Sequence, residues 1–312
     1  MKRNTNQEKQ KYRGASGFDL YYGELFSDRW GTLKKSLLAE TRHASLTFPG
    51  CETYFMDPAS ICAALCLPLD DSENVLDLCA APGGKTLVVS ANLAPGSELK
   101  SNERSAERKN RLAKVVSASL PQDISNRIKV TCSDGATLCQ RDDTRYGSIL
   151  LDAPCSSERH VLNDEKYLSQ WSPARLKSLA MEQWALVSSA WRLLDEGGFL
   201  LYATCALSPK ENDEIISRLA KKFSDAEIQS TDFMENVFKK NLAGMESKKI
   251  VAEIQAREEN ESPTMEKVFQ MAEPTEHGLQ ILPDSSNGYG PLFFSLVKKC
   301  VPNPDSKSKS DF

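Results

Sequence analysis

The stretch LDLCAAPGGKT, residues 76–86, decides the fold, because it joins an apolar strand-like run to a Gly-rich turn and a helix-like segment. Its end, Gly-Gly-Lys-Thr, fits the end of the P-loop pattern G-x-x-x-x-G-K-[ST]. Cys79, however, stands where that pattern needs its first Gly, and Pro82 has no N–H to offer a phosphate. Two interpretations stay open: a P-loop NTPase, or a loop that binds another cofactor at the carboxyl edge of a sheet.

Acidic residues at the ends of the next strand-like segments favour the second interpretation. Glu103 lies 19 residues after Gly84, where a carboxylate accepts hydrogen bonds from both hydroxyls of a ribose. Asp134 ends the following segment, where it would either meet adenine or cap a helix, and Asp152 ends the next. An adenosine cofactor that has no phosphate to clamp is S-adenosylmethionine. The sequence therefore predicts a site for this cofactor.

The order of segments predicts an α/β fold with a mostly parallel sheet and helices on both faces. The expected strands are 74–80, 97–103, 127–134, 146–154 and 197–205. The expected helices between and after them are 86–93, 105–120, 172–195 and 208–223. Two further strands, in 278–284 and 289–299, would add a C-terminal antiparallel hairpin. The total of seven strands is that of the common class I methyltransferase sheet, a relative of the Rossmann fold.

We expect the chain to divide into three parts. Residues 1–70 would form a small N-terminal helical extension, 71–300 the methyltransferase domain, and 301–312 a disordered tail. Residues 224–275 are charged and lack a clear period, which predicts a long irregular excursion from the domain with some helix in it. Ser208 and Glu211 form a capping-box pattern at the start of the helix 208–223.

Composition excludes several classes of protein. The 312 residues carry a net charge of −4, so binding to nucleic acid through overall charge is not expected. No apolar run approaches the length of a membrane span, and the polar start MKRNTNQEKQKYR argues against a secretory signal. Nine cysteines without a C-x-x-C pair, with only three histidines, argue against a zinc site and a disulfide framework, so no metal is expected. We expect a cytoplasmic protein, or a mitochondrial one in a eukaryote.

Two cysteines follow strands and should meet at the carboxyl edge of the sheet. Cys155 follows the strand 146–154 in the turn DAPC, and Cys205 ends the strand 197–205. A thiolate that adds to C6 of cytosine activates C5 toward a methyl donor, and a second group must then remove the C5 proton. An acid near N3 of the ring would assist by neutralising charge as the adduct forms. The alternative is that both thiols are buried structural residues at strand ends.

Three segments carry a family resemblance: LDLCAAPGGKT, DAPCSS and YATCALSPKENDEII. They resemble the signature blocks of the RsmB/Nop/Sun family of S-adenosylmethionine-dependent RNA cytosine-5 methyltransferases, over roughly residues 50–223 and 277–299. The resemblance implies that Cys205 is the nucleophile, that Cys155 assists product release, and that the catalytic acid Asp152 lies where the cytosine ring enters. It also implies that the cofactor is bound by Cys79, Ala80, Ala81, Pro82, Gly83, Gly84, Lys85, Glu103, Asp134 and Asp152.

This chain departs from the family pattern at two places. Met56 replaces an amide in the block Tyr54–Ser60, and Ser157 stands where the family often has Gly after its Pro-Cys-Ser turn. The first 50 residues are too short for the helical domain of the long members, and no PUA-like segment follows residue 300. We therefore expect a short form that methylates ribosomal RNA, with transfer RNA as the alternative substrate. A non-catalytic RNA-binding ribosome-assembly factor is the alternative of another class.

RNA contacts must come from local clusters of positive charge, because the chain as a whole is acidic. Arg159 and His160, beside the active-site turn, and Lys85 are the expected contacts. Two other clusters are candidates whose alternatives are a solvated helix face and a disordered start: Arg104, Arg108, Lys109, Arg111 and Lys114, and Lys2, Arg3, Lys9, Lys11 and Arg13. The target cytosine would be unpaired or flipped, the protein a monomer, and a partner protein would add RNA affinity.

Overall fold

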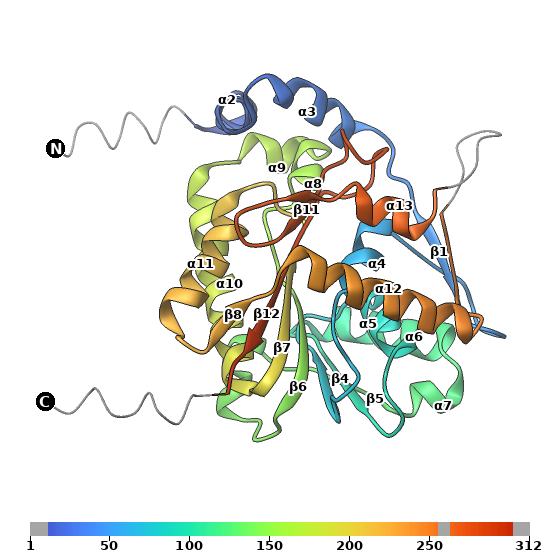
Figure 1. Cartoon of the computed structure of the whole chain (residues 1–312). Coiled ribbons are helices and arrows are strands. Elements are labelled where there is room, and N and C mark those ends of the chain that lie inside the picture. Colours follow the sequence, from blue (N-terminus) through green and yellow to red (C-terminus); the bar gives the residue numbers. More distant parts are fainter. Residues whose placement is uncertain (1–11, 255–262, 302–312) are drawn as a thin grey trace, which may run out of the picture.

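The computed structural model describes residues 12–254 and 263–301, and its centre is a twisted nine-stranded sheet (Figure 1). The strand order is β10-β11-β12-β7-β6-β3-β4-β5, and β8 pairs with β12 beside this path. The strands of the sheet are β3 (Asn74–Asp77), β4 (Glu98–Asn102), β5 (Ile128–Thr131), β6 (Tyr146–Asp152), β7 (Leu194–Thr204), β8 (Ala226–Ile228), β10 (Glu273–Pro274), β11 (Leu279–Ile281) and β12 (Leu292–Lys299).

Five of these strands, β3 to β7, are parallel, and β12 runs antiparallel to both β7 and β11. The predicted α/β fold, its parallel core and its antiparallel hairpin are therefore confirmed. The expected number of seven strands is wrong, because β8 and β10 add to the sheet. These two strands have only three and two residues, too few to show an alternation of apolar and polar side chains.

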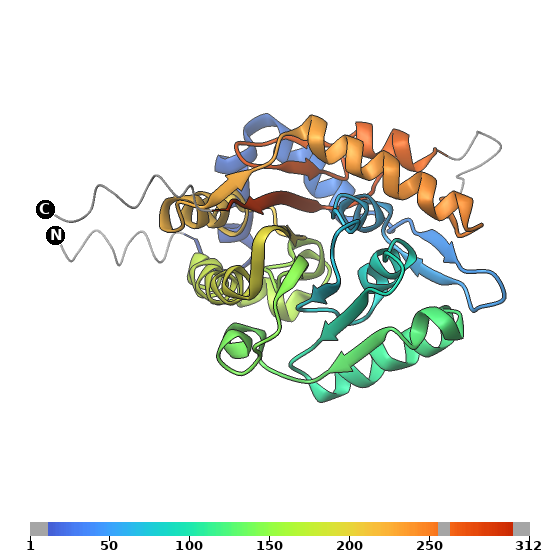
Figure 2. The same cartoon turned by 60° about the horizontal axis from the view of Figure 1, so that its bottom comes forward.

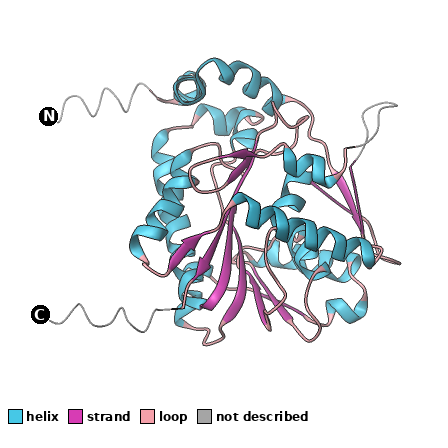
Figure 3. Ribbon diagram, viewed as in Figure 1, coloured by secondary structure: helices cyan, strands magenta, loops and turns pink. Residues whose placement is uncertain are grey.

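Helices cover both faces of the sheet (Figures 2 and 3). Leu76 and Ile149 face α10 and α11, whereas Val75 and Leu150 face α4, α5 and α12, as the alternation of side chains along a strand requires. The helices of this layer structure are α4 (Pro58–Leu65), α5 (Gly84–Ala91), α6 (Ala106–Ser119), α7 (Gln122–Ser125), η2 (Gly135–Gln140), α10 (Pro173–Leu193), η3 (Pro209–Glu211), α11 (Asp213–Lys222), α12 (Thr231–Ser247) and α13 (Met265–Gln270).

The first part of the chain is not a purely helical extension. It contains α2 (Gly14–Phe26), η1 (Ser27–Arg29), α3 (Trp30–Leu38), β1 (Ala44–Thr47) and β2 (Tyr54–Met56). The strand β1 pairs with β2 and with β9 (Val251–Ile254), which forms a second, three-stranded sheet. The helix α4, expected in the extension, is buried in the main core, so this part of the chain contributes to that core.

The prediction of an irregular excursion at 224–275 is wrong for the part that the structure describes. This segment holds β8, α12, β9, α13 and β10, while 255–262 lie outside the described residues. The 17-residue helix α12 buries Met234, Phe238, Leu242 and Met245 against the sheet. Those apolar positions do recur every three to four residues, but the charged residues between them hide the pattern. The predicted tail 301–312 lies outside the described residues except for residue 301.

An aromatic cluster fixes α2 and α3 to the domain. Trp171, before α10, is 2% exposed, and its ring lies 5.1 Å from that of Phe18 and 5.5 Å from that of Tyr21. The short helices α8 (Glu158–Leu162) and α9 (Glu165–Ser169) pack beneath α3 and α2, as Figure 1 shows. The same cluster therefore supports the segment that follows Cys155.

We expect Trp171→Ala to lower the free energy of unfolding by about 3–5 kcal/mol, because it leaves a cavity among packed aromatic rings. Urea denaturation followed by circular dichroism measures this change. Met181→Ala, at a side chain that is 63% exposed, is the control and should change stability by less than about 0.5 kcal/mol. Equal effects of the two variants would contradict the role given to the cluster.

Candidate active site

A cavity of about 750 Å³ lies at the carboxyl ends of the parallel strands, where open α/β sheets bind ligands. It is lined by segments from six regions of the chain: β2 with the start of α4, the end of β3 with the loop after it, α6, the turn after β6 with α8, the turn after β7, and the start of β12 with the residues before it. The polar and sulfur-containing lining residues are Tyr54, Met56, Asp57, Ser60, Asp77, Cys79, Lys85, Arg108, Asp152, Cys155, Ser157, Arg159, His160, Asn163 and Cys205.

The loop after β3 forms one wall of the cavity and depends on its two glycines. Gly83 has φ of 124°, and a Cβ there would lie 3.0 Å from Val115 Cγ1. A Cβ on Gly84 would lie 3.0 Å from Met56 Cε and from Tyr54 Cε1. The Gly-Gly pair therefore lets the turn pass closely between α6 and β2. Met56, which departs from the family pattern, packs on this turn.

Most of the predicted cofactor loop lines the cavity. Cys79, Ala80, Ala81, Pro82, Gly84 and Lys85 are on its wall, and Gly83 begins the helix α5 behind it. Burial raises the pKa of the Cys79 thiol well above its ordinary value, and nearby Asp77 and Glu103 add to the effect. Cys79 is therefore a poor nucleophile at neutral pH, in keeping with the expectation that this residue contributes through its backbone.

Asp77, at the end of β3, is a lining residue that the sequence reasoning missed. Its Oδ2 accepts a hydrogen bond from Thr86 Oγ1 at 2.6 Å, and its Oδ1 is buried without a partner among the described residues. Burial raises the pKa of Asp77 to about 7. The signal was an acid inside the apolar run 74–80. A buried carboxylate oxygen that lacks a donor suits a cationic group of a ligand.

Asp152 and Lys85 form an ion pair inside the cavity. Lys85 Nζ lies 2.7 Å from Asp152 Oδ2 and also donates to Ser60 Oγ at 3.2 Å. Burial opposes the charge on Lys85, but the neighbouring carboxylate outweighs it and raises the pKa of the ammonium. The predicted RNA contact of Lys85 remains a prediction, because its ammonium is held by Asp152 and Ser60.

Cys155 and Cys205 meet at the cavity, as their positions after β6 and β7 predict. Their Sγ atoms are 2.9 Å apart, and both cysteines are free. The hydrogen bond from Cys155 lowers the pKa of Cys205 despite its burial, and a further hydrogen bond from Ser157 helps. The same sulfur–sulfur contact, together with burial, raises the pKa of Cys155. Cys205 is therefore the thiol that ionises first, and Cys155 keeps its proton.

A buried pair of carboxylates supports the turn that carries Cys155. Ser156 Oγ contacts both Glu158 Oε1 and Glu211 Oε2, and Ser156 N donates to Glu211 Oε1 at 3.0 Å. Gln183 Nε2 also donates to Glu211 Oε1, at 2.9 Å. One hydroxyl proton cannot serve two carboxylates at once, so the cluster holds an additional proton. Sequence reasoning missed this cluster, because it joins side chains 55 residues apart.

Ser208 caps a helix as predicted, but the expected capping box with Glu211 is wrong. Ser208 Oγ accepts a hydrogen bond from Lys210 N, and Glu211 turns inward to the Cys155 turn. The expected helix 208–223 is accordingly split into η3 and α11. The physical reason is that the buried donors of Ser156 and Gln183 bind the carboxylate, which then cannot reach back to the N-cap.

The proton of this cluster predicts a pH-dependent stability. Burial, with help from Glu158, raises the pKa of Glu211 to about 7. A raised carboxyl pKa stabilises the folded state fully below the unfolded pKa, and this contribution is lost as pH rises through about 7. We expect the unfolding free energy of the wild type to fall between about pH 5 and 7.5 and that of Glu211→Gln to fall less.

Urea titrations at several pH values measure this difference. Glu246→Gln, at an exposed position, is the control and should keep the pH dependence of the wild type. An unchanged pH dependence in Glu211→Gln would show that the proton is not held by this cluster.

Two of the predicted acids do not line the cavity. Glu103 is buried, its Oε1 accepts from Ser105 N at 2.9 Å, and its Oε2 lies 3.4 Å from Arg108 Nη1. Asp134 is exposed and caps η2 through a hydrogen bond from Ala136 N. The cap is the alternative that the sequence left open for Asp134. The cofactor roles of both residues remain predictions.

Arg159 lines the cavity but uses its guanidinium to fix the backbone. Nη1 donates to the carbonyls of Leu37 and Ala39, and Nη2 donates to those of Gly288 and Gly290. The expected RNA contact of Arg159 therefore remains a prediction, with its terminal nitrogens already engaged. His160 is exposed on the cavity rim, and its ring lies 5.3 Å from that of Tyr167.

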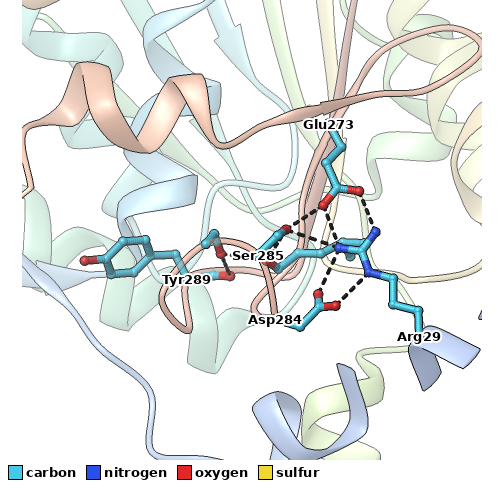
Figure 4. Close-up of polar contacts among 7 residues, drawn as sticks. Arg29, Glu273, Asp284, Ser285 and Tyr289 are labelled. Carbon is cyan, nitrogen blue, oxygen red and sulfur yellow. Dashed lines mark hydrogen bonds and ion pairs between the residues drawn. The ribbon is translucent and has the colours of Figure 1, made fainter. Parts of the chain in front are cut away.

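A second arginine holds the same C-terminal loop from the outside. Figure 4 shows Arg29 between Glu273 and Asp284, with Nη2–Oε1 and Nε–Oδ2 distances of 2.6 and 2.7 Å. The partly buried Asp57 accepts a hydrogen bond from Gly290 N at 2.9 Å. The loop that brings Gly290 to the cavity is thus fixed by side chains from the first 60 residues and by Arg159.

The two other basic clusters have limited support. Arg104, just before α6, pairs with Glu182, while on α6 itself Arg108 donates to Ala81 O and Arg111 contacts Glu107. The charge of this helix is therefore partly neutralised, and only Arg108 reaches the cavity. In the N-terminal cluster, Lys2, Arg3, Lys9 and Lys11 lie outside the described residues.

The described residues contain neither a candidate metal site nor a candidate membrane span. Within 12–254 and 263–301, no group of three or more His, Cys, Asp or Glu side chains is arranged to hold a metal ion. Over the same residues, no helix combines the length and apolar character needed to cross a membrane.

Comparison with known proteins places this fold and site in a class and a family. The solved structures of NSun6 and of a methyltransferase homologue, both from Pyrococcus horikoshii, share the class I methyltransferase fold. Their TM-scores are 0.55 and 0.62, at 19% and 16% identity. The match to NSun6 covers 80% of this chain and 54% of the NSun6 chain. The match to the methyltransferase homologue covers 89% of this chain and 93% of the homologue. The profile described as "16S rRNA methyltransferase RsmB/F" matches residues 64–295, and the chain belongs to this family.

Curated relatives are named for two kinds of RNA. The mouse mitochondrial tRNA (cytosine(34)-C(5))-methyltransferase is 31% identical over 79% of this chain and 63% of its own length. Mouse 5-cytosine rRNA methyltransferase NSUN4 is 36% identical over 52% of this chain and 44% of its own. Ribosomal RNA small subunit methyltransferase F of Erwinia tasmaniensis is 34% identical over 50% and 32%. The chain thus spans about a third to two thirds of the length of these relatives.

Proposed function

We propose that this protein methylates C5 of cytosine in RNA, with S-adenosylmethionine as methyl donor and a covalent adduct between Cys205 and C6 of the ring. The observation that carries the proposal is the pair of thiols 2.9 Å apart on the cavity wall that also bears the cofactor loop. The family assignment leaves the P-loop NTPase without support. Ribosomal RNA is the first substrate proposed, because the family and two of the relatives are named for it.

The chemistry assigns one task to each polar group in the cavity. The Cys205 thiolate adds to C6, and the electron pair of the C5–C6 double bond shifts toward C4, which places negative charge on N3. Asp152, protonated or through its pair with Lys85, neutralises the charge that develops at N3. The bound cofactor would supply an electrophilic methyl group that bonds to C5. Cys155 then assists the removal of the proton from C5. The electron pair of that C–H bond re-forms the C5–C6 double bond, and the bond between C6 and Cys205 breaks.

The cavity residues fit such a cofactor. The unpartnered Oδ1 of Asp77 suits the ammonium of its methionine portion, and the backbone of the loop 79–85 would lie along it. Glu103 would hold the ribose hydroxyls and Asp134 would lie near adenine. A cavity open at its rim, with His160 beside it, would admit a flipped base but not a paired one.

Methyl transfer tests this proposal. Labelled S-adenosylmethionine should transfer its methyl group to cytosine C5 in a small-subunit ribosomal RNA transcript, as nucleoside mass spectrometry would show. S-adenosylhomocysteine should raise the melting temperature of the protein, and ATP with Mg²⁺ should not. Cofactor binding without label in any RNA would favour the non-catalytic assembly factor.

Transfer RNA is the second candidate substrate. The relative that covers 79% of this chain, more than the other two, is named for a cytosine of transfer RNA. Competition between ribosomal transcripts and total transfer RNA for limiting enzyme separates the two substrates, and bisulfite sequencing then locates the methylated position.

We further propose that the protein is a monomer in the cytoplasm, or in mitochondria of a eukaryote, and that an RNA-binding partner aids it. Light scattering and fractionation test these points.

A further inference from the structure

Ser157 occupies an unusual backbone position next to the two thiols. Its φ and ψ are 54° and 62°, in the left-handed region that residues with a Cβ rarely adopt. A glycine would adopt this conformation without strain. The chain instead keeps a side chain there, at a cost that persists in folded proteins mainly at functional sites.

The hydroxyl of Ser157 is directed at the reacting sulfur. Its Oγ lies 3.2 Å from Cys205 Sγ and 3.6 Å from Cys155 Sγ, and the residue lines the cavity. Ser157 stands at the N-cap of α8, where serine usually accepts a hydrogen bond from the helix backbone, yet its side chain makes no such bond. The hydroxyl is therefore available to the sulfurs and not used by the helix.

We propose that the Ser157 hydroxyl donates a hydrogen bond to Cys205 Sγ and holds this sulfur as a thiolate, in addition to the bond from Cys155. Either atom of the Ser157–Cys205 contact can donate while Cys205 is a thiol, but only the hydroxyl can donate to the thiolate. The contact thus favours the ionised state. Two donors on one sulfur also leave the nucleophile with a partner when Cys155 turns toward C5.

This inference rests on the proposed function, in which Cys205 is the nucleophile, but its test needs neither RNA nor cofactor. The full chain is alkylated with iodoacetamide across a range of pH, and the rate at Cys205 is followed by peptide mass spectrometry. Ser157→Ala removes the hydroxyl and keeps the Cβ, whereas Ser157→Gly removes both. Each variant is made in the wild type and in Cys155→Ala, where Ser157 is the remaining donor to this sulfur.

A hydrogen bond to an ionised group is strong enough to move a pKa by about one unit. We expect both Ser157 variants to raise the pKa of Cys205 by about that much, in both backgrounds. The alkylation rate near pH 7 should fall only about threefold, because a more basic thiolate is also a better nucleophile. Ser157→Gly should melt at a higher temperature than Ser157→Ala, since it relieves the left-handed strain.

Two results would overturn the inference. One is an unchanged pKa of Cys205 in the folded Ser157→Ala protein. The other is a raised pKa in Ser157→Gly but not in Ser157→Ala, which would assign the effect to the left-handed backbone that Ala retains. If Ser157→Ala fails to fold, Ser157→Gly decides by itself. If the Ser157 variants raise the pKa of Cys205 but the wild type transfers no methyl group, the proposed function is wrong and this inference stands.

Discussion

A Cys155→Ala variant incubated with S-adenosylmethionine and substrate RNA should accumulate a covalent protein–RNA complex that survives denaturing electrophoresis. Cys205→Ala should form no such complex and should transfer no methyl group. The reason is the order of ionisation: the pKa of Cys205 is lowered by its hydrogen bond from Cys155, whereas that of Cys155 is raised by the same contact. In the proposed mechanism Cys205 therefore attacks the ring, and without Cys155 the adduct would persist.

The matched control is Cys132→Ala, at an exposed thiol that does not line the cavity. This variant should turn over normally and leave no adduct on the gel. If Cys205→Ala traps RNA and Cys155→Ala does not, the roles of the two thiols are exchanged. If neither variant traps RNA while the wild type methylates it, the covalent route itself is wrong.

Replacing Asp152 by Asn should lower the methylation rate by about 10²–10⁴-fold, the usual contribution of a positioned acid or base. Asp152 is a partly exposed carboxylate on the cavity wall, 2.7 Å from the buried ammonium of Lys85. Asn keeps the shape but can neither carry a proton to the ring nor balance the charge of Lys85. The effect should appear mainly in kcat, because the charge to be neutralised develops after binding.

The comparison variant is Glu182→Gln, which removes a carboxylate from a surface ion pair with Arg104 and should leave the rate within about twofold of the wild type. Single-turnover kinetics with saturating cofactor measure both variants. If Asp152→Asn raises KM and leaves kcat unchanged, Asp152 binds the cofactor or the cytosine and does not act as the acid.

The parts of the site that follow from sheet geometry could be predicted from the sequence. Cys155 and Cys205 come after neighbouring parallel strands, and such strands end at the same edge. Contacts that depend on the direction of a side chain could not be predicted. Glu211 looks like a capping residue in sequence and turns inward in the structure, because buried donors on the Cys155 turn bind it.

The partners of charged side chains could not be predicted from the sequence either. A basic residue beside an active-site turn suggests a phosphate contact, and Arg159 has that position. Its guanidinium nevertheless serves four carbonyls, two of which belong to a loop 129 and 131 residues further along the chain. No local sequence pattern shows that these carbonyls need a hydrogen-bond donor, because unpaired backbone carbonyls arise only when the loops are folded.

The position of the last strand has a consequence for synthesis on the ribosome. β12 lies inside the sheet between β7 and β11, and Gly290, Pro291 and Leu292 at its start complete the cavity wall. A nascent chain therefore lacks part of the site until residues 290–292 have left the exit tunnel. Because an incomplete cavity would not hold both base and cofactor, we expect no methylation by nascent chains whose residues 290–292 are still in the exit tunnel.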